Sequence, residues 1–221
     1  MKHEDVLAQT SFFAETPATT LATIATHATT QQLQRGDVLF SEGDVPDALF
    51  VVLTGRIAIA VDNKPLDARA SVLALMEAGD LFGELGLLDS GARSAMARAI
   101  EASTVLRIPY EPVVEHMRSN PTMLWGVAKL LASRLRTMDE VLSDSVFLDV
   151  TGRTAKRLLE LSGGNDEFVL PVTQEELAGM VGASRERVNK AIASFIRLGW
   201  LEQHDRRYHI LMRDRLEVRS S

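Results

Sequence analysis

The sequence of 221 residues contains no cysteine. This absence excludes disulfide scaffolds, cysteine-held iron–sulfur clusters, thiolate zinc sites and cysteine nucleophiles. No apolar run approaches the roughly 18 residues that a membrane-spanning helix needs. The first residues, MKHEDVLAQT, also lack the basic-then-apolar pattern of a secretion signal. We therefore expect a cytoplasmic protein that does not enter a membrane.

Histidine is missing from the part of the chain that is richest in strand signals. The five histidines are His3, His27, His116, His204 and His209, so none lies between residues 28 and 115. A metal-dependent enzyme built on a β-domain would need ligands there, and a serine or lysine nucleophile has no evident base nearby. A haem sensor would depend on His27 or His116 alone. The sequence therefore favours a protein that is not an enzyme and holds no metal.

Negative charge dominates the chain, with a net charge of −6, but it is unevenly distributed. Residues 1–149 hold 12 basic and 20 acidic residues, a net charge of −8, whereas residues 150–221 hold 12 and 10, a net charge of +2. This division is typical of an acidic regulatory domain joined to a smaller domain that approaches a polyanion. Ordinary scatter of charge between two surfaces explains it equally well.

The first part of the chain, residues 4–34, is predicted to be helical and then irregular, and a β-rich part follows. From residue 35, short runs of Val, Ile, Leu and Phe alternate with Gly-Asp and Thr-Gly turns about every ten residues. This rhythm, with a further strand pair in SAMARAIEASTVLRIPY, predicts an antiparallel, jelly-roll-like β-roll of about eight strands.

From residue 111 the apolar pattern becomes helical. Positions recur at steps of four and three residues, namely Leu124, Ala128, Leu131, Leu135, Met138, Leu142 and Ser145. Such a heptad seam predicts a long helix that pairs with a second copy of itself, although one helix packed on the β-roll would show a similar stripe. The expected domains are therefore a β-roll at 1–115, a dimerisation helix and hinge at 116–148, and a third domain at 149–221. Within FLDVTGR, Asp149 or Thr151 can cap the helix that follows.

The last 70 residues carry the signals of a winged helix-turn-helix, so the fold class is α+β. Thr173 opens a capping box with Glu176, and Gly182 supplies the turn into a second helix that Ser184 caps. The stretch WLEQHDRRYHILMRD then predicts two short strands around a polar turn, which form the wing.

The second helix of this motif is expected to read double-stranded DNA. Its N-terminal residues enter the major groove, where Arg185 and Lys190 can reach guanines and Glu186 can accept from cytosine. The predicted DNA contacts are Thr173, Ser184, Arg185, Glu186, Arg187, Lys190 and Arg206, with Arg187, Arg206 and Arg207 assigned to phosphates. The alternative is a solvated helix face with an i,i+4 pair between Glu186 and Lys190.

Charged residues also lie among apolar ones and glycines in FGELGLLDSGARSA, residues 82–95. A short helix beginning near Gly83 would point backbone amides at an anion, and Arg93 and Ser94 could bind the same phosphate. Glu84 only accepts hydrogen bonds when ionised, so it suits a sugar hydroxyl. The segment therefore predicts a nucleotide monophosphate site, with a Glu84–Arg93 pair that only fixes the loop as the alternative.

These motifs resemble those of the CRP/FNR transcription regulators, in particular the cAMP receptor branch. The resemblance rests on FGELGLL followed by RSA, on FLDVTGR, and on VGASRERVNKAIASFIRLGWL, and it extends over nearly the whole chain. It implies a cyclic nucleotide, most commonly cAMP, bound by Gly83, Glu84, Leu85, Arg93 and Ser94. It also implies a bacterial homodimer on palindromic TGTGA-like sites, with RNA polymerase as a further partner.

One departure from the branch concerns the base of the nucleotide. Where the cAMP receptor branch has an adjacent Thr-Ser pair for adenine, this chain has Met138 and Asp139. Met138 can pack against a base, and Asp139 can accept from the amine of adenine or from the N1/N2 edge of guanine. An effector-independent regulator, or one that responds to cGMP or a cyclic dinucleotide, therefore remains the alternative.

Overall fold

The structure, a computed structural model, describes residues 2–62 and 70–221, without the side chains of residues 62, 70 and 71. The described residues divide into two compact units. The first contains residues 2–61 and 74–136, and the second contains residues 62, 70–73 and 137–221. No helix among the described residues is both long and apolar enough to cross a membrane.

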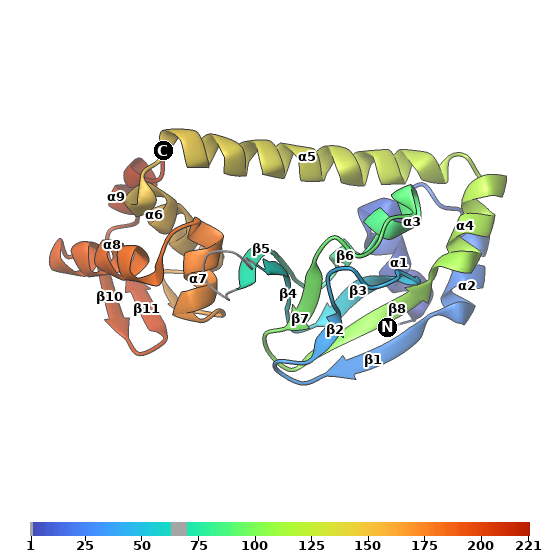
Figure 1. The fold of residues 1–221 in the computed structure, drawn as a ribbon, viewed down its shortest axis with the longest axis horizontal. Helices are drawn as coiled ribbons and strands as arrows, with labels where there is room; N and C mark the ends of the chain where they lie inside the picture. The colour runs from blue at the N-terminus through green and yellow to red at the C-terminus, as the bar shows by residue number, and fades with distance from the viewer. Residues whose placement is uncertain (1, 63–69) are drawn as a thin grey trace. The chain divides into compact units, whose positions relative to one another are not determined.

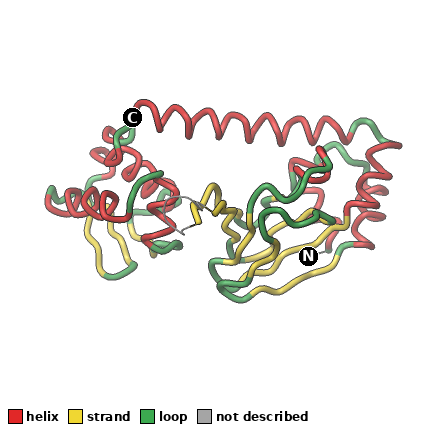
Figure 2. Tube along the Cα trace, viewed as in Figure 1, coloured by secondary structure: helices red, strands yellow, loops and turns green. Residues whose placement is uncertain are grey.

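The described residues between 29 and 109 form a β-roll, as the sequence predicts (Figures 1 and 2). The described strands are β1 (Thr29–Leu33), β2 (Val38–Phe40), β3 (Ala48–Thr54), β4 (Ile57–Asp62), β5 (Ala70–Met76), β6 (Leu81–Phe82), β7 (Met96–Ala99) and β8 (Ser103–Pro109). They form two four-stranded sheets, in the orders β1-β8-β3-β6 and β2-β7-β4-β5. The pairings of β8 with β1 and β3, of β3 with β6, and of β7 with β2 and β4 are antiparallel.

Strand β3 is buried on both of its faces. Because successive side chains of a strand point to opposite sides, its residues alternate between two apolar clusters. Leu49 and Val51 pack into the cluster that the helices share, whereas Phe50 and Val52 pack inside the roll. The roll is thus joined to the helices through the same strand that lines its interior.

Helices cover one end of the β-roll (Figure 1). They are α1 (His3–Gln9), the 3-10 helix η1 (Ser11–Phe13), α2 (Ala18–His27) and α4 (Tyr110–Ser119), and they share an apolar cluster with the start of α5 (Met123–Phe147). The backbone of α5 passes so close to η1 that a Cβ at Gly126 would lie 2.4 Å from the carbonyl oxygen of Phe12. Only glycine permits this approach.

The long helix α5 is separated from α4 by a short break. The expected segment of helix and hinge was 116–148, whereas α4 ends at Ser119 and α5 runs from Met123 to Phe147. Pro121 lacks an N–H donor and disfavours helical backbone at the residue before it. Asn120 accordingly has φ −128° and ψ 81°, and the chain turns there.

The second unit is a winged helix-turn-helix, as predicted. Its elements are α6 (Val150–Leu161), β9 (Glu167–Val169), α7 (Gln174–Val181), α8 (Arg185–Arg197), β10 (Leu201–His204), β11 (Arg207–Ile210) and α9 (Arg213–Arg219). The strands pair in the order β10-β11-β9. Gly182 has φ +67° at the turn between α7 and α8, in the left-handed region that glycine enters without strain. The terminal helix α9 was not predicted.

Asp149 is the N-cap of α6, one of the two caps that the sequence allowed. Its Oδ1 accepts from the amide of Gly152 at 2.8 Å, and its Oδ2 pairs with Arg219 at the end of α9. The hydrogen bond from Gly152, together with the Arg219 guanidinium, lowers the pKa of this carboxyl. Asp149 therefore joins the first turn of α6 to the C-terminal helix.

Replacing Asp149 should test this junction. We expect Asp149→Ala to lower the free energy of unfolding by about 0.5–2 kcal/mol in urea denaturation at pH 7, because the helix cap is lost. Asp149→Asn keeps a capping oxygen and should lose less.

The contribution of Asp149 should also depend on pH. Because the folded-state pKa is lowered, the ionised form stabilises the fold above the ordinary aspartate pKa, and this contribution disappears as the pH falls through the folded-state pKa. The difference in the free energy of unfolding between wild type and Asp149→Asn should therefore shrink at low pH. An Asp149→Ala variant as stable as wild type would contradict the assignment of Asp149 as the cap of α6.

Candidate functional site

The charged segment singled out in the sequence lies between β6 and β7 of the first unit. Gly83 follows β6 with φ +83°, and the short helix α3 (Leu85–Asp89) follows Glu84. A Cβ at Gly83 would lie 2.7 Å from Nη1 of Arg93, so this position also requires glycine for space. The fold thus brings Arg93 against Gly83, the residue before Glu84.

Arg93 is buried, with 6% of its surface exposed, and is fixed by carbonyl and hydroxyl oxygens. Its Nη1 donates to the carbonyl of Gly83 at 2.9 Å and to the hydroxyl of Tyr110 at 3.0 Å, and its Nη2 donates to the carbonyl of Ala48 at 2.8 Å. The backbone is fixed too, because Arg93 exchanges hydrogen bonds with Gly43 and Asp44.

Three of the five guanidinium N–H groups are therefore engaged. The Nε–H and one N–H of Nη2 have no acceptor among the residues that the structure describes. With two free N–H donors, the guanidinium can form a bidentate hydrogen bond to a phosphate. The same guanidinium lies 4.2 Å from the ring centre of Phe40, which supports its charge through a cation–π contact.

Glu84 is completely buried and pairs with a residue that the sequence did not indicate. Its Oε1 lies 2.7 Å from Nη1 of Arg134 on α5, and Nη2 of Arg134 donates to the carbonyl of Leu81 at 2.7 Å. The predicted alternative, a Glu84–Arg93 pair, is not among the ion pairs of the described residues. Arg134 carried no signal beyond its place as a charged residue beside the heptad seam.

The other residues predicted to bind the nucleotide are exposed to solvent. Leu85 is 41% exposed at the start of α3, and Ser94 is exposed next to Arg93 in the chain. Met138 and Asp139 lie on the exposed surface of α5, one turn and more beyond Arg134, and belong to the second unit. Their part in reading the base therefore stays a prediction.

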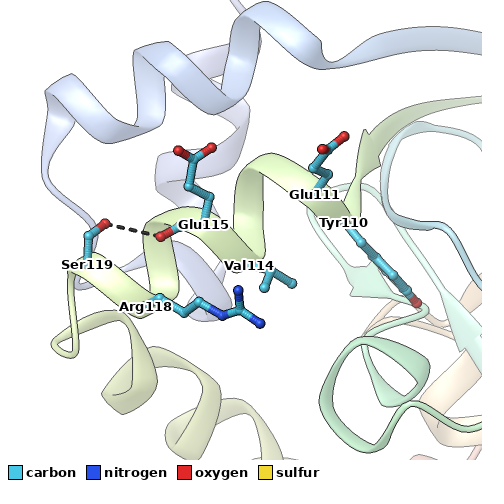
Figure 3. Close-up of a pocket in the computed structure, with 6 residues that line it drawn as sticks. All are labelled: Tyr110, Glu111, Val114, Glu115, Arg118 and Ser119. Atoms are coloured by element: carbon cyan, nitrogen blue, oxygen red, sulfur yellow. Dashed lines mark hydrogen bonds between the residues drawn. The ribbon is translucent and has the colours of Figure 1, made fainter.

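Tyr110 was not predicted and connects the segment to α4. Figure 3 shows its side chain directed away from the Glu111 and Glu115 carboxylates of the same helix. It lines an open hollow of about 630 Å³ along α4, together with Val114 and Arg118. Burial raises the pKa of its hydroxyl, against the effect of the Arg93 guanidinium, so the group is protonated at neutral pH.

In the second unit, the helix caps form as predicted. Thr173 Oγ1 accepts from the amide of Glu176 at 3.1 Å, and Glu176 Oε2 accepts from the amide of Thr173 at 2.7 Å. Ser184 Oγ accepts from the amide of Arg187 at 3.4 Å. The apolar stripe of α8, from Val188 to Phe195, is buried.

The polar face of α8 is exposed, with Arg185, Glu186, Arg187 and Lys190 in solvent. Glu186 and Lys190 form an i,i+4 pair at 2.7 Å, and this contact lowers the pKa of the glutamate. Both side chains are 75% exposed, so the pair is weak and can open toward another partner.

Three of the residues predicted to contact DNA line the same hollow. Thr173, Arg185 and Arg206 line a depression of about 310 Å³ between the first turn of α7, the start of α8 and the wing. Arg206 is held there because its Nη2 donates to the carbonyl of Leu170 at 2.9 Å. The fold thus gathers residues from three segments around one hollow, which Glu175 and Asp205 also line.

Two family models match the chain. A cyclic nucleotide-binding domain matches residues 30–120, and a Crp-like helix-turn-helix domain matches residues 152–219. The chain is 31% identical over 224 residues to the CRP-like cAMP-activated global transcriptional regulator of Mycobacterium tuberculosis, covering 98% of this chain and 99% of that one.

The chain belongs to the CRP/FNR family of transcription regulators. It is also 30% identical over 180 residues to the cAMP-activated global transcriptional regulator CRP of Salmonella typhimurium, covering 78% of this chain and 85% of the relative. The c-di-GMP responsive global regulator CLP of Xanthomonas campestris has a similar structure, with a TM-score of 0.75 and 25% identity over 88% of this chain and 99% of that one. The CRP/FNR family consists of DNA-binding regulators rather than enzymes, and its β-roll is a cyclic nucleotide-binding domain.

The buried Glu84–Arg134 pair gives a prediction about stability. Arg134→Met leaves the fully buried carboxylate of Glu84 without its cation, and an unpaired buried charge destabilises the folded state. Because Arg134 is about one-third exposed, we expect a loss of about 2 kcal/mol in the free energy of unfolding, below the usual cost of breaking a fully buried pair. Urea denaturation followed by circular dichroism measures it.

Lys129→Met is the matched control, because Lys129 lies on the same helix and pairs with Glu15 at an exposed site. Its loss should stay below about 1 kcal/mol. Adding Glu84→Gln to Arg134→Met should restore part of the stability, and equal losses for the two single variants would contradict the assigned importance of the buried pair.

Proposed function

We propose that this regulator is a homodimer that binds palindromic TGTGA-like sites under the control of cAMP. The observation that carries the proposal is the Arg93 guanidinium. It is buried, held on one side by Gly83, Ala48 and Tyr110, and left with two N–H donors. That arrangement suits the cyclic phosphate, and the acceptor-only Glu84 beside it suits a ribose hydroxyl.

The choice of cAMP as effector rests on the relatives. The relatives from Mycobacterium tuberculosis and Salmonella typhimurium are both named as cAMP-activated regulators, and the first is matched over nearly its whole length. Two observations argue against cAMP. Met138 and Asp139 cannot supply the hydroxyls of a Thr-Ser pair, and one structural neighbour responds to c-di-GMP. The second candidate is therefore the same DNA-binding function with cGMP, a cyclic dinucleotide or no effector.

The proposal of a homodimer rests on the exposed apolar seam of α5. Leu124, Leu135, Met138 and Leu142 are between 50% and 67% exposed in the single chain. A heptad stripe of this kind is buried when two such helices pair. A two-fold dimer presents two copies of α8, which accounts for a palindromic site. RNA polymerase as a partner stays a prediction from the family resemblance.

The effector is tested by calorimetric titration of the ligand-free protein with cAMP, cGMP and c-di-GMP. We expect heat of binding with cAMP, and abolished binding in Arg93→Leu, because the phosphate loses its charged partner. Arg56→Leu is the matched control, since Arg56 pairs with Glu77 and Glu101 elsewhere in the β-roll. If no cyclic nucleotide binds to a folded dimer, the effector proposal is wrong.

DNA recognition is tested by substitutions at two neighbouring arginines. Arg185→Ala should cost about 1–3 kcal/mol on a TGTGA-like site and lose discrimination at one guanine. Arg187→Ala, assigned to a phosphate, should weaken binding to all sequences alike and reduce its salt dependence. Fluorescence anisotropy on a set of single-base variants distinguishes the two patterns, and a sequence-independent loss for Arg185→Ala would reject base reading by that residue.

A further inference from the structure

Tyr110 lies where three separate parts of the β-roll meet. It is the first residue of α4, directly after β8, and its backbone amide donates to the carbonyl of Asp47 at 2.9 Å. Its hydroxyl donates to the carbonyl of Gly83 and accepts from Nη1 of Arg93. One phenol oxygen therefore joins α4 to both ends of the predicted phosphate segment.

The three groups form a closed set of hydrogen bonds. The Gly83 carbonyl accepts from both Tyr110 and Arg93, and Tyr110 in turn accepts from Arg93. Both hydrogens of Nη1 are used in this way, while Nη2 keeps one bond, to Ala48. Any rotation of the guanidinium about its long axis would break bonds at Nη1, so its direction is fixed.

This fixed direction determines which donors remain for a ligand. Without the Tyr110 oxygen, Nη1 would have one unused hydrogen, and the guanidinium would have a reason to turn toward another acceptor. The raised pKa of Tyr110 keeps its hydroxyl protonated, so that it can donate to Gly83 and accept from Arg93 at once. The aromatic ring alone cannot do either.

We propose that Tyr110 is a positioning residue whose hydroxyl holds the Arg93 guanidinium with its Nε–H and free Nη2–H directed to the cyclic phosphate. The residue does not touch the nucleotide in this proposal; it acts through Arg93. The proposal rests on the proposed function, because it requires a cyclic nucleotide whose phosphate binds Arg93.

The test is a double-mutant cycle on the affinity for cAMP, measured by calorimetry with the full-length protein. Tyr110→Phe removes one oxygen and keeps the ring. We expect it to weaken cAMP binding about tenfold, the order of one hydrogen bond to a charged group. In an Arg93→Lys background, where no guanidinium is left to orient, the same substitution should change the affinity by less than about twofold.

The chain offers a matched control, because it has only two tyrosines. Tyr208→Phe removes the hydroxyl of the other tyrosine, which lies in β11 of the second unit, and should leave the affinity for cAMP unchanged. Thermal unfolding of each variant shows whether a change in affinity follows from loss of the fold.

The outcomes separate the two proposals. If wild type binds cAMP and Tyr110→Phe binds it equally well, the positioning role is wrong while the proposed function stands. If Tyr110→Phe weakens binding by the same factor in both backgrounds, the hydroxyl acts on the fold rather than on Arg93, and the positioning role is again wrong. If wild type binds no cyclic nucleotide, both proposals fail.

Discussion

The burial of two opposite charges within ten residues of sequence is the constraint on which this β-roll depends. Glu84 is fully buried and Arg93 nearly so, and a buried charge is tolerated only with partners. The chain does not pair them with each other. Glu84 faces Arg134 on α5, whereas Arg93 is surrounded by the oxygens of Gly83, Ala48 and Tyr110. Keeping them apart leaves each with capacity for a further polar contact.

The two sets of partners also connect the site to different helices. The Arg93 set includes Tyr110 at the start of α4, and the Glu84 pair includes a residue of α5, the helix that continues toward the DNA-binding part of the chain. A ribose hydroxyl at Glu84 would share that carboxylate with Arg134, and so would change an interaction of α5 directly. Allosteric control requires that a ligand bind two states of the protein differently, and this shared carboxylate offers a physical basis for such a difference.

The sequence predicted what is encoded by neighbouring residues. The β-roll, the capping box at Thr173, the left-handed turn at Gly182 and the cap at Ser184 all follow from patterns within a few positions, and all are confirmed. The interruption before α5 has an equally local signal in Pro121, which the expected boundary at residue 116 did not take into account.

The contacts that were missed join residues far apart in the chain. Arg134 lies 50 positions after Glu84, Tyr110 17 after Arg93, and Arg219 70 after Asp149. No local periodicity records such pairs, because the fold alone brings them together. The same is true of Thr173, Arg185 and Arg206 in the second unit. Each was predicted singly as a DNA contact, but the sequence did not show that the three line one hollow.

The central claim is that a cyclic nucleotide in the β-roll controls DNA binding by the second unit. It is tested most directly by the affinity for a duplex with palindromic TGTGA half-sites, measured at one fixed salt concentration with and without saturating cAMP. A coupling of ordinary size predicts binding that is roughly 5–150 times tighter with cAMP. Equal affinity in both conditions, with cAMP shown to be bound, would contradict the account.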